Sequence, residues 1–229
     1  MSPHVRRVRR ARVRRLAGVV VAAAVLSAAA GCGGESEAEQ PKSSKAGRDA
    51  TSVIAGLKVC QLTSLAPLVK VLGSPGYESG PAEVAKGSGV EPAGPQCAAQ
   101  LKLPQLTNVA GNKEDLVPAR LMISVAGYGG KAEADERFAA RLAEAEKLGG
   151  TTKDLPGAWT VGKLVTAELG TEDVVAAQVQ QDNYVIRIYL QITSDSTSRE
   201  KFRFTTAQVA STVATVTGSL HSAVSAKVQ

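Results

Sequence analysis

Apolar side chains recur at helical spacing in three segments of the chain. Residues 131–148 (KAEADERFAARLAEAEKL) are the clearest case, because an apolar stripe runs along one side of the segment and two glycines follow it directly. A shorter stripe over residues 63–72 and a longer one over residues 198–224 predict two further helices. The inward side chains of the last helix are expected to be Val209, Val213, Val216, Leu220 and Val224.

Other segments alternate with the period of two that is typical of strands. Residues 97–103, 119–126 and 159–169 predict strands, and VVAAQVQQDNYVIRIYLQI (residues 174–192) predicts a hairpin about a polar link. Residues 74–95 are dense in glycine and proline and predict a long loop. Runs of strands with helices gathered beside them predict an α+β fold, an antiparallel sheet with helices packed mainly on one face.

Residues 1–31 have the order of a bacterial lipoprotein signal peptide. Seven arginines precede an uncharged run from Leu16 to Ala30, and Ala29-Ala30-Gly31-Cys32 resembles the lipobox, where the signal is cut and the cysteine is acylated. The uncharged run rises only about 22 Å as a helix, against a hydrocarbon core of about 30 Å, so a permanent transmembrane anchor is the weaker interpretation. A secreted protein with a free Cys32 is the alternative, and general secretion and twin-arginine export both stay open.

Removal of the signal changes the charge of the protein. The whole chain has 27 basic and 21 acidic residues and a net charge of +6, and loss of the seven arginines leaves a net charge of −1. Nucleic-acid binding needs a basic face against phosphates, so we expect no nucleic-acid partner. Residues 32–50 contain Cys32 and a flexible tether without large apolar residues, and residues 51–229 are expected to form one domain. We therefore expect the domain on the extracytoplasmic face of the cell membrane, held by palmitate-type acyl chains on Cys32.

Cys60 and Cys97 remain once Cys32 is assigned to the lipid anchor. An even pair in an exported domain favours a structural disulfide, and closing so long a loop stabilises a fold by roughly 4 kcal/mol. Two buried free thiols and a redox pair are the alternatives. A redox pair usually has Cys-x-x-Cys spacing, which these residues lack.

Candidate catalytic chemistry is sparse after the cleavage point. His221 is the only histidine there, and we expect it at a surface or half-buried position of the last helix rather than as a general base. The sequence has no Gly-x-Ser-x-Gly elbow, no phosphate loop ending in Gly-Lys-Ser and no cluster of metal ligands. We predict no catalytic residue, no metal site and no cofactor, and leave open a glycosidase that works with two carboxylates.

The chain has few aromatic residues from which to build a ligand site, with one Trp, four Tyr and three Phe. Tyr77, Tyr128 and Trp159 are weak candidates for the rim of a ligand site, and packing at the edge of the core is the alternative for all three. The loop at 74–95 is expected to carry a binding surface, because loops held by rigid scaffolds often do so, or else to be a tolerated insertion.

The residues VCQLTSLAPLVKVLG…QCAAQL resemble an actinobacterial lipoprotein family of unknown function. Its members have a Cys-x-Leu-Thr helix and a second cysteine on a later strand, and the resemblance spans residues 55–224. The resemblance implies an α+β domain closed by a helix, and it implies no catalytic residues. Two functions follow as expectations. The first is a non-catalytic binding or sensing module of the cell envelope that recognises a protein partner or a cell-wall component. The second is a carrier of a lipid or other small apolar molecule.

Overall fold

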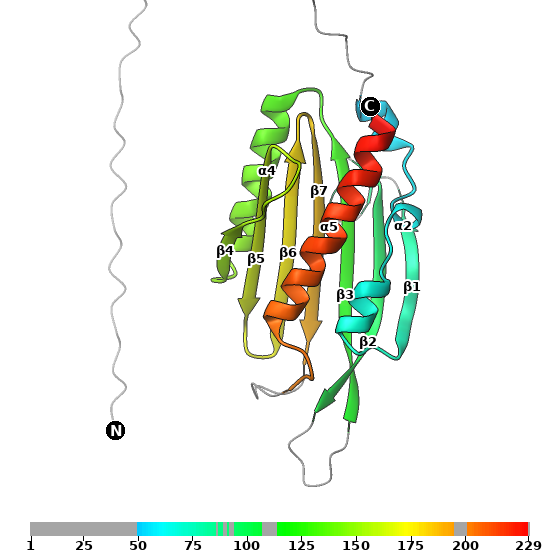
Figure 1. The fold of residues 1–229 in the computed structure, drawn as a ribbon, viewed down its shortest axis with the longest axis vertical. Coiled ribbons are helices and arrows are strands. Elements are labelled where there is room, and N and C mark those ends of the chain that lie inside the picture. Colours follow the sequence, from blue (N-terminus) through cyan, green and yellow to red (C-terminus); the bar gives the residue numbers. More distant parts are fainter. Residues whose placement is uncertain are drawn as a thin grey trace, which may run out of the picture. The chain divides into compact units, whose positions relative to one another are not determined.

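The computed structural model describes residues 50–85, 87–88, 91, 94–106, 114–194 and 201–228. The signal peptide, Cys32 and almost all of the expected tether lie outside these residues. The elements in chain order are α1 (Ala50–Ala55), α2 (Val59–Leu62), α3 (Ala66–Val71), β1 (Gly76–Val84), β2 (Gln96–Leu106), β3 (Glu114–Gly127), α4 (Lys131–Glu146), β4 (Thr151–Asp154), β5 (Val161–Glu168), β6 (Glu172–Gln181), β7 (Tyr184–Thr193) and α5 (Thr206–Val228) (Figure 1). Among the described residues, no helix has both the length and the apolar character needed to cross a bilayer.

The strands of the described region form one seven-stranded sheet in the order β1-β2-β3-β7-β6-β5-β4. Every neighbouring pair is antiparallel. The strand β7 lies in the centre, between β3 and β6, although it is the last of the seven strands in chain order. The predicted α+β fold with an antiparallel sheet is confirmed.

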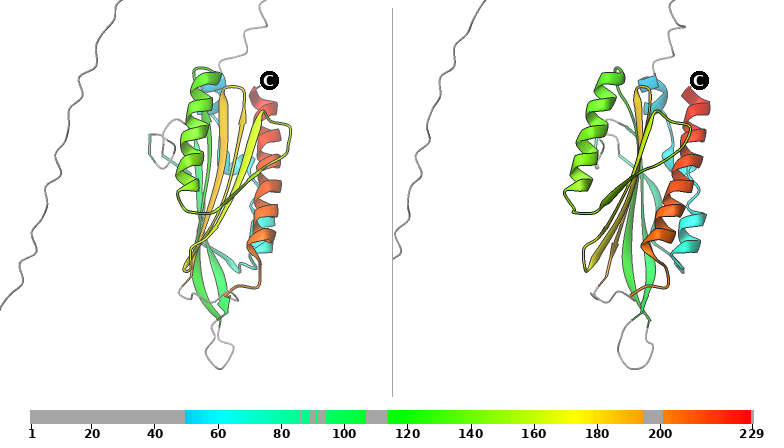
Figure 2. Two further views of the ribbon diagram at one scale, coloured as in Figure 1. Left: turned by 90° about the vertical axis from the view of Figure 1, so that its left-hand side faces the viewer. Right: turned by 60° about the vertical axis from the view of Figure 1, so that its left-hand side comes forward.

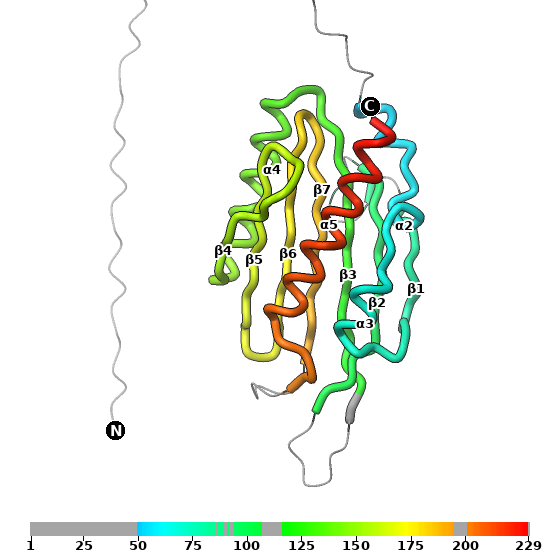
Figure 3. Tube along the Cα trace, in the orientation of Figure 1, coloured from blue at the N-terminus to red at the C-terminus, as the bar shows by residue number. Residues whose placement is uncertain are grey.

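Four helices cover one face of the sheet, and α4 covers part of the other (Figure 2). On the first face, α5 runs across β5, β6 and β7, and α3 lies beside α5 (Figure 3). The predicted inward stripe of α5 is confirmed, because all five of its valine and leucine side chains are buried in the main core. They pack there with Ile186, Ile188 and Leu190 of β7, which face the same side because side chains alternate along a strand.

Two glutamines of β6 attach α4 to the opposite face. The side-chain amide of Gln178 donates a hydrogen bond to the carbonyl of Phe138 at 2.7 Å, and the amide of Gln180 donates to a carboxylate oxygen of Asp135 at 2.6 Å. Phe138 is itself buried against a small cluster that includes Val185. The polar positions that alternate along β6 thus hold a helix instead of facing water.

The glycine-rich segment 74–95 is not a long loop, and that prediction was wrong for residues 76–84. These residues form β1, the edge strand that pairs with β2. Six of its nine side-chain positions are exposed, and its register shifts twice between Tyr77 and Ala82. Pro81 and such irregularities are typical of an edge strand, which needs no apolar alternation of its own because its neighbour supplies the pairing.

The last helix begins later than the hydrophobic pattern predicts. Residues 201–205 are not helical, and α5 starts at Thr206. The side chains of Thr205 and Gln208 explain the start. Thr205 Oγ1 accepts from the backbone N–H of Gln208 at 3.2 Å, while Gln208 Oε1 accepts from the N–H of Thr205 at 2.8 Å. This reciprocal arrangement is a capping box, and it fixes the first turn.

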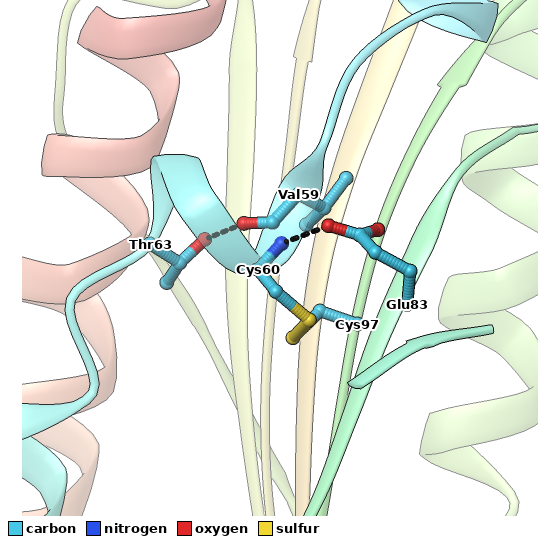
Figure 4. The surroundings of a disulfide bond; sticks show 5 residues. All are labelled: Val59, Cys60, Thr63, Glu83 and Cys97. Atoms are coloured by element: carbon cyan, nitrogen blue, oxygen red, sulfur yellow. Dashed lines mark hydrogen bonds between the residues drawn. A yellow bond between two sulfur atoms is a disulfide. The ribbon is translucent and has the colours of Figure 1, made fainter. Parts of the chain in front are cut away.

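Cys60 and Cys97 are joined by a disulfide, as predicted (Figure 4). The bond connects α2 to β2 across Cα atoms 5.0 Å apart. The backbone N–H of Cys60 also donates to Glu83 Oε1 of β1 at 2.9 Å. The short helix α2 is therefore attached both to the edge strand β1 and to its neighbour β2.

Candidate functional site

The three aromatic residues suggested as ligand contacts do not gather in one place. Tyr77 lies at the start of the edge strand β1 and packs partly against the main core. Tyr128 follows β3 and is buried in the small cluster beneath α4. Trp159 lies in the bend before β5, near the opposite edge of the sheet. The structure thus provides no shared rim made of these three side chains.

Trp159 is held by its own surroundings. Its indole N–H donates to the carbonyl of Leu155 at 2.8 Å. A Cβ atom added at Gly157 would lie 2.2 Å from the indole ring, and one added at Gly162 would lie 2.4 Å from its nitrogen. The two glycines therefore make the space that the indole occupies. The indole and the ring of His221 form a T-shaped pair, with centroids 5.4 Å apart and planes at 84°.

A pocket of about 310 Å³ that opens to the surface is lined in part by His221. We call it the His221 pocket. The turn between β6 and β7, the bend before β5 and the last turns of α5 form its walls. Its lining residues are Ala158, Gln181, Asp182, Tyr184, His221, Ser222, Ser225 and Val228. Ligand pockets commonly begin at about this volume.

His221 is buried, with an exposed fraction of 6%, so the prediction of a surface or half-buried position was wrong. It lies one residue after Leu220 on the inward stripe of α5, and the aromatic rings of Trp159 and Tyr184 cover it. The His221 and Tyr184 rings are stacked, with centroids 6.2 Å apart. Hydrophobic periodicity could not predict that His221 is buried, because the rings that bury it come from two distant segments.

Three polar side chains connect the floor of the pocket to the last turns of α5. The hydroxyl groups of Tyr184 and Ser225 lie 2.8 Å apart, and Ser225 Oγ lies 3.3 Å from Nε2 of His221. His221 and Ser225 are four residues apart on one helix, so their side chains point to the same side. The three groups form a hydrogen-bonded chain, and its direction depends on which ring nitrogen of His221 carries the proton.

Burial sets the protonation states of the His221 and Tyr184 side chains. It lowers the pKa of His221 below 6.5, because a charged imidazolium loses solvation there. Burial also raises the pKa of Tyr184; the hydrogen bond with Ser225 opposes that shift, and the nearby charge of Asp182 adds to it. At pH 7 the imidazole and the phenol are therefore both neutral.

Two described residues of the glycine-rich segment, Ser88 and Glu91, have contacts with β2 or α4. The side-chain amide of Gln96 donates to the carbonyls of Ser88 and Glu91, at 2.7 and 2.9 Å, and its oxygen accepts from the N–H of Glu91 at 3.1 Å. The Glu91 carboxylate lies 3.3 Å from Arg141 of α4. Burial, followed by the charge of Glu91, raises the pKa of Tyr128 to about 12. Glu91 is thus attached both to Gln96 of β2 and to Arg141 of α4.

Two further hollows have a different character. One, of about 480 Å³, lies between α3 and α5 and is lined by Lys70 and Arg203 among mostly polar side chains. The other, of about 280 Å³, lies beside α4 and includes the oppositely charged Arg187 and Glu144. Neither contains a stacked aromatic pair with a hydrogen-bonded network, which distinguishes the His221 pocket as the candidate functional site.

The chemistry available in the His221 pocket is limited. Ser225 and His221 lie in contact, but no carboxylate contacts the imidazole in the described structure to orient it, as hydrolytic triads require. Within the described ranges, no three His, Cys, Asp or Glu side chains lie close enough together to hold a metal ion. The arrangement is suited to accepting hydrogen bonds and to enclosing a small group.

Sequence reasoning selected Trp159 but missed Tyr184, Asp182 and Ser225. A partial signal existed, since Tyr184 directly follows the hairpin turn and Ser225 repeats the helical face of His221. Nothing in the sequence shows that the turn and the helix end meet.

Comparison of the chain with protein-family models, with curated proteins and with solved structures found no match.

Proposed function

We propose that the protein is a lipid-anchored extracytoplasmic module of the cell envelope that binds its ligand without transforming it. The observation that carries the proposal is the Cys60–Cys97 disulfide. Disulfides form and persist in oxidising compartments outside the cytoplasm and are rare inside it. The bond therefore agrees with export, and the order of arginines, apolar residues and Cys32 supplies a route and an anchor.

The His221 pocket supports binding more than catalysis. Its buried polar groups are already satisfied by one another, and the described structure has no buried side-chain nitrogen or oxygen without a hydrogen-bond partner. A catalytic site usually keeps a strained or poorly paired group for the transition state. A satisfied network beside an open hollow is instead what a binding site needs, since such a network holds its side chains in place for a ligand.

The alternative function, carriage of an apolar molecule, would need a cavity between the sheet and its helices. Side chains of the main core fill that layer along the described strands, including Leu101, Leu121, Ile188, Leu190 and Val213. The three hollows described above all open at the surface. The geometry therefore favours a site for a small polar group over a carrier cavity.

Fractionation of a bacterial host that expresses the full chain tests the proposed anchor. We expect the wild-type protein in the membrane fraction, extractable with detergent. The Cys32→Ser variant should be released or should accumulate as an uncleaved precursor. The Cys60→Ser/Cys97→Ser variant is the control, because it loses the disulfide and keeps the anchor. Normal processing and membrane retention of Cys32→Ser would refute lipid anchoring.

A further inference from the structure

The His221 pocket carries one formal charge, and that charge is negative. Of its eight lining residues, Asp182 is the only acidic one, and none is lysine or arginine. His221 is neutral there because burial lowers its pKa. The hollow between α3 and α5 has two cations instead, and the hollow beside α4 has one charge of each sign. Among these three sites, the His221 pocket alone favours a cation.

Asp182 presents its carboxylate from a fixed position. It lies in the two-residue turn between β6 and β7, with φ at 49°, a left-handed conformation that Asp and Asn adopt more readily than most residues. The amide of Gln181 donates to its carboxylate at 3.1 Å. An ionised carboxylate has about four lone-pair sites, so this one bond leaves acceptor capacity for a ligand. Asp182 and Tyr184 line the same pocket, and the charge of Asp182 adds to the raised pKa of the Tyr184 phenol.

The other groups of the pocket complement an ammonium ion. The hydroxyl oxygens of Tyr184, Ser222 and Ser225 accept hydrogen bonds, and Ala158 and Val228 offer apolar surface for a short carbon chain. A protonated amine has three N–H donors and no acceptor. It would therefore gain a charged hydrogen bond to the carboxylate while leaving the neutral Tyr184–Ser225–His221 network intact.

We propose that the His221 pocket binds the ammonium group of a small primary amine, with Asp182 as its counter-ion. This inference rests on the proposed binding function and deepens it by naming the class of ligand. Asp182 makes the charged contact, the hydroxyl groups add directional hydrogen bonds, and Ala158 and Val228 receive the adjoining carbons.

The turn that carries Asp182 lies close to the first described residues of the chain. The carbonyl of Tyr128 accepts hydrogen bonds from Thr51 Oγ1 at 3.2 Å and from Asn183 Nδ2 at 3.0 Å. Thr51 follows the first described residue, and Asn183 belongs to the turn that carries Asp182. The helix α1 and the turn that carries Asp182 thus both contact Tyr128. The amine has two possible sources, a free metabolite or an ethanolamine headgroup, which share the same recognition chemistry.

Trp159 provides the readout for a binding experiment. It is the only tryptophan of the chain and contacts His221 directly. The full-length protein, purified in non-ionic detergent, is titrated with ethanolamine and, separately, with propane-1,3-diol, while Trp159 fluorescence and heat of binding are recorded. We expect saturable binding of ethanolamine and at least about tenfold weaker binding of the neutral diol, since a charged hydrogen bond is worth that much. Equal binding of the two probes, or no saturation with ethanolamine, overturns the proposal.

Two variants and one control sharpen the test. Asp182→Asn keeps the shape and the tolerance of a left-handed turn but removes the charge, so ethanolamine affinity should fall at least about tenfold. Ala158→Phe, at an exposed position, should block the hollow by bulk and abolish binding, even if Asp182→Asn folds poorly. Asp154→Asn is the control, because it removes an exposed carboxylate of β4 that pairs with Lys163. Equal loss in Asp154→Asn, or unchanged affinity in Asp182→Asn and Ala158→Phe, contradicts the assignment.

The pH dependence of ethanolamine affinity supplies a readout that a purely structural role of His221 would not give. His221 faces Trp159, Tyr184, Ser225 and the turn with Asp182. Its protonation places a positive charge beside the ammonium, so ethanolamine affinity should fall below the pKa of His221 while diol affinity stays level. Binding that strengthens as the pH falls contradicts the proposal.

Vesicles distinguish the two sources of the amine. If the ligand is a headgroup, the cleaved and released form of the Cys32→Ser protein should bind phosphatidylcholine vesicles only when phosphatidylethanolamine is added. If the ligand is a free amine, vesicles of both compositions should leave the fluorescence of Trp159 unchanged, while ethanolamine alone still binds. An anchored protein that ignores amines would refute this inference and keep the anchor. A protein that binds ethanolamine but is not acylated would refute the anchor and keep the site.

Discussion

The hydroxyl groups of Tyr184 and Ser225 lie 2.8 Å apart and join the central strand β7 to the last turns of α5. The two residues are 41 positions apart in the sequence. Both groups belong to the network that forms the floor of the His221 pocket. This contact therefore couples the end of the closing helix to the hairpin turn.

The Tyr184–Ser225 contact should be measurable by a double-mutant cycle. Tyr184→Phe and Ser225→Ala should each lower the free energy of unfolding by about 1 kcal/mol, and the double variant should lose less than the sum, because both remove the same bond. Urea denaturation provides the values. Ser222→Ala is the matched control, since its exposed hydroxyl bonds only to Gly218 of its own helix, and it should change stability by less than about 0.5 kcal/mol. Full additivity of the two losses would show that the bond does not form.

The stability of the protein should decrease as the pH falls from about 7.5 to about 5.5. Burial lowers the pKa of His221 in the folded state, whereas the unfolded chain keeps the ordinary value of 6.5. Below 6.5 the unfolded state thus binds a proton that the folded state takes up less readily, and stability is lost. Denaturant titrations at several pH values should show the slope in the wild type, and His221→Gln should flatten it. An equal slope in both would assign the pH dependence to other groups.

Lys201 and Asp173 form an ion pair at 3.2 Å in which both side chains are about 10% exposed. Lys201→Met should destabilise the fold by about 3–5 kcal/mol, because it leaves a buried carboxylate without its cation. The pair Lys201→Met/Asp173→Leu should recover most of that loss, since an apolar pair needs no desolvation of charge. Thermal and urea unfolding test both expectations. A double variant as unstable as Lys201→Met would show that the carboxylate is not the cause.

The same ion pair should give a pH-dependent signature. Burial raises the pKa of Asp173, and the hydrogen bond from Lys201 only partly offsets it. The folded state therefore keeps a proton on Asp173 at pH values where the unfolded chain has already released it. The stability that this proton contributes is lost as the pH rises through the raised pKa of Asp173. The destabilisation of Lys201→Met should accordingly be smaller at pH 4 than at pH 7.

Two glycine substitutions should change stability in opposite directions. A Cβ atom at Gly162 would lie 2.4 Å from the indole nitrogen of Trp159 and 2.5 Å from the carbonyl of Leu155, so Gly162→Ala should cost about 1–3 kcal/mol and shift Trp159 fluorescence. A Cβ at Gly218 of α5 meets nothing within 4 Å, so Gly218→Ala should stabilise the protein by about 1 kcal/mol through helix propensity. Denaturation curves of the two variants check both signs. A neutral Gly162→Ala would mean that the indole can move away.

Removal of the disulfide should destabilise the domain without changing its fold. The bond spans 37 positions, for which loop-closure entropy gives roughly 4 kcal/mol. Cys60→Ser/Cys97→Ser should therefore unfold at a lower urea concentration while keeping the far-ultraviolet circular dichroism of the wild type. Intact mass after alkylation without reductant should show no modified Cys60 or Cys97 in the wild type. Two alkylated thiols in that sample would contradict the bond.

Local patterns were sufficient to predict most of the elements near the centre of the fold. The alternation in β6 and β7, the turn between them and the apolar stripes of α4 and α5 all correspond to observed elements. These elements are buried on at least one face, so their sequences carry the period of the structure they form. The pairing of Cys60 with Cys97 was predicted for a different reason, since only these two cysteines remain once Cys32 is assigned to the lipid anchor.

Elements at the margins depend on their neighbours. The strand β1 is mostly exposed and rich in glycine, and it is a strand because β2 offers it hydrogen-bonding partners. The short strand β4 has only four residues and was not predicted at all; it pairs with β5 in the same way. The start of α5 required the Thr205–Gln208 capping box, a local signal that hydrophobic spacing does not contain.

The sequence by itself determined the class of fold, the buried faces, the disulfide and the expectation of an exported, anchored protein. Only the tertiary structure decided the candidate site, because the His221 pocket joins the turn at Asp182, the bend at Ala158 and the end of α5. Periodicity reports which side of an element is buried, but it carries no information about which distant side chains meet there. His221 shows the physical reason, since two aromatic rings from other segments bury it and make it neutral, and no residue beside it in the chain predicts that environment.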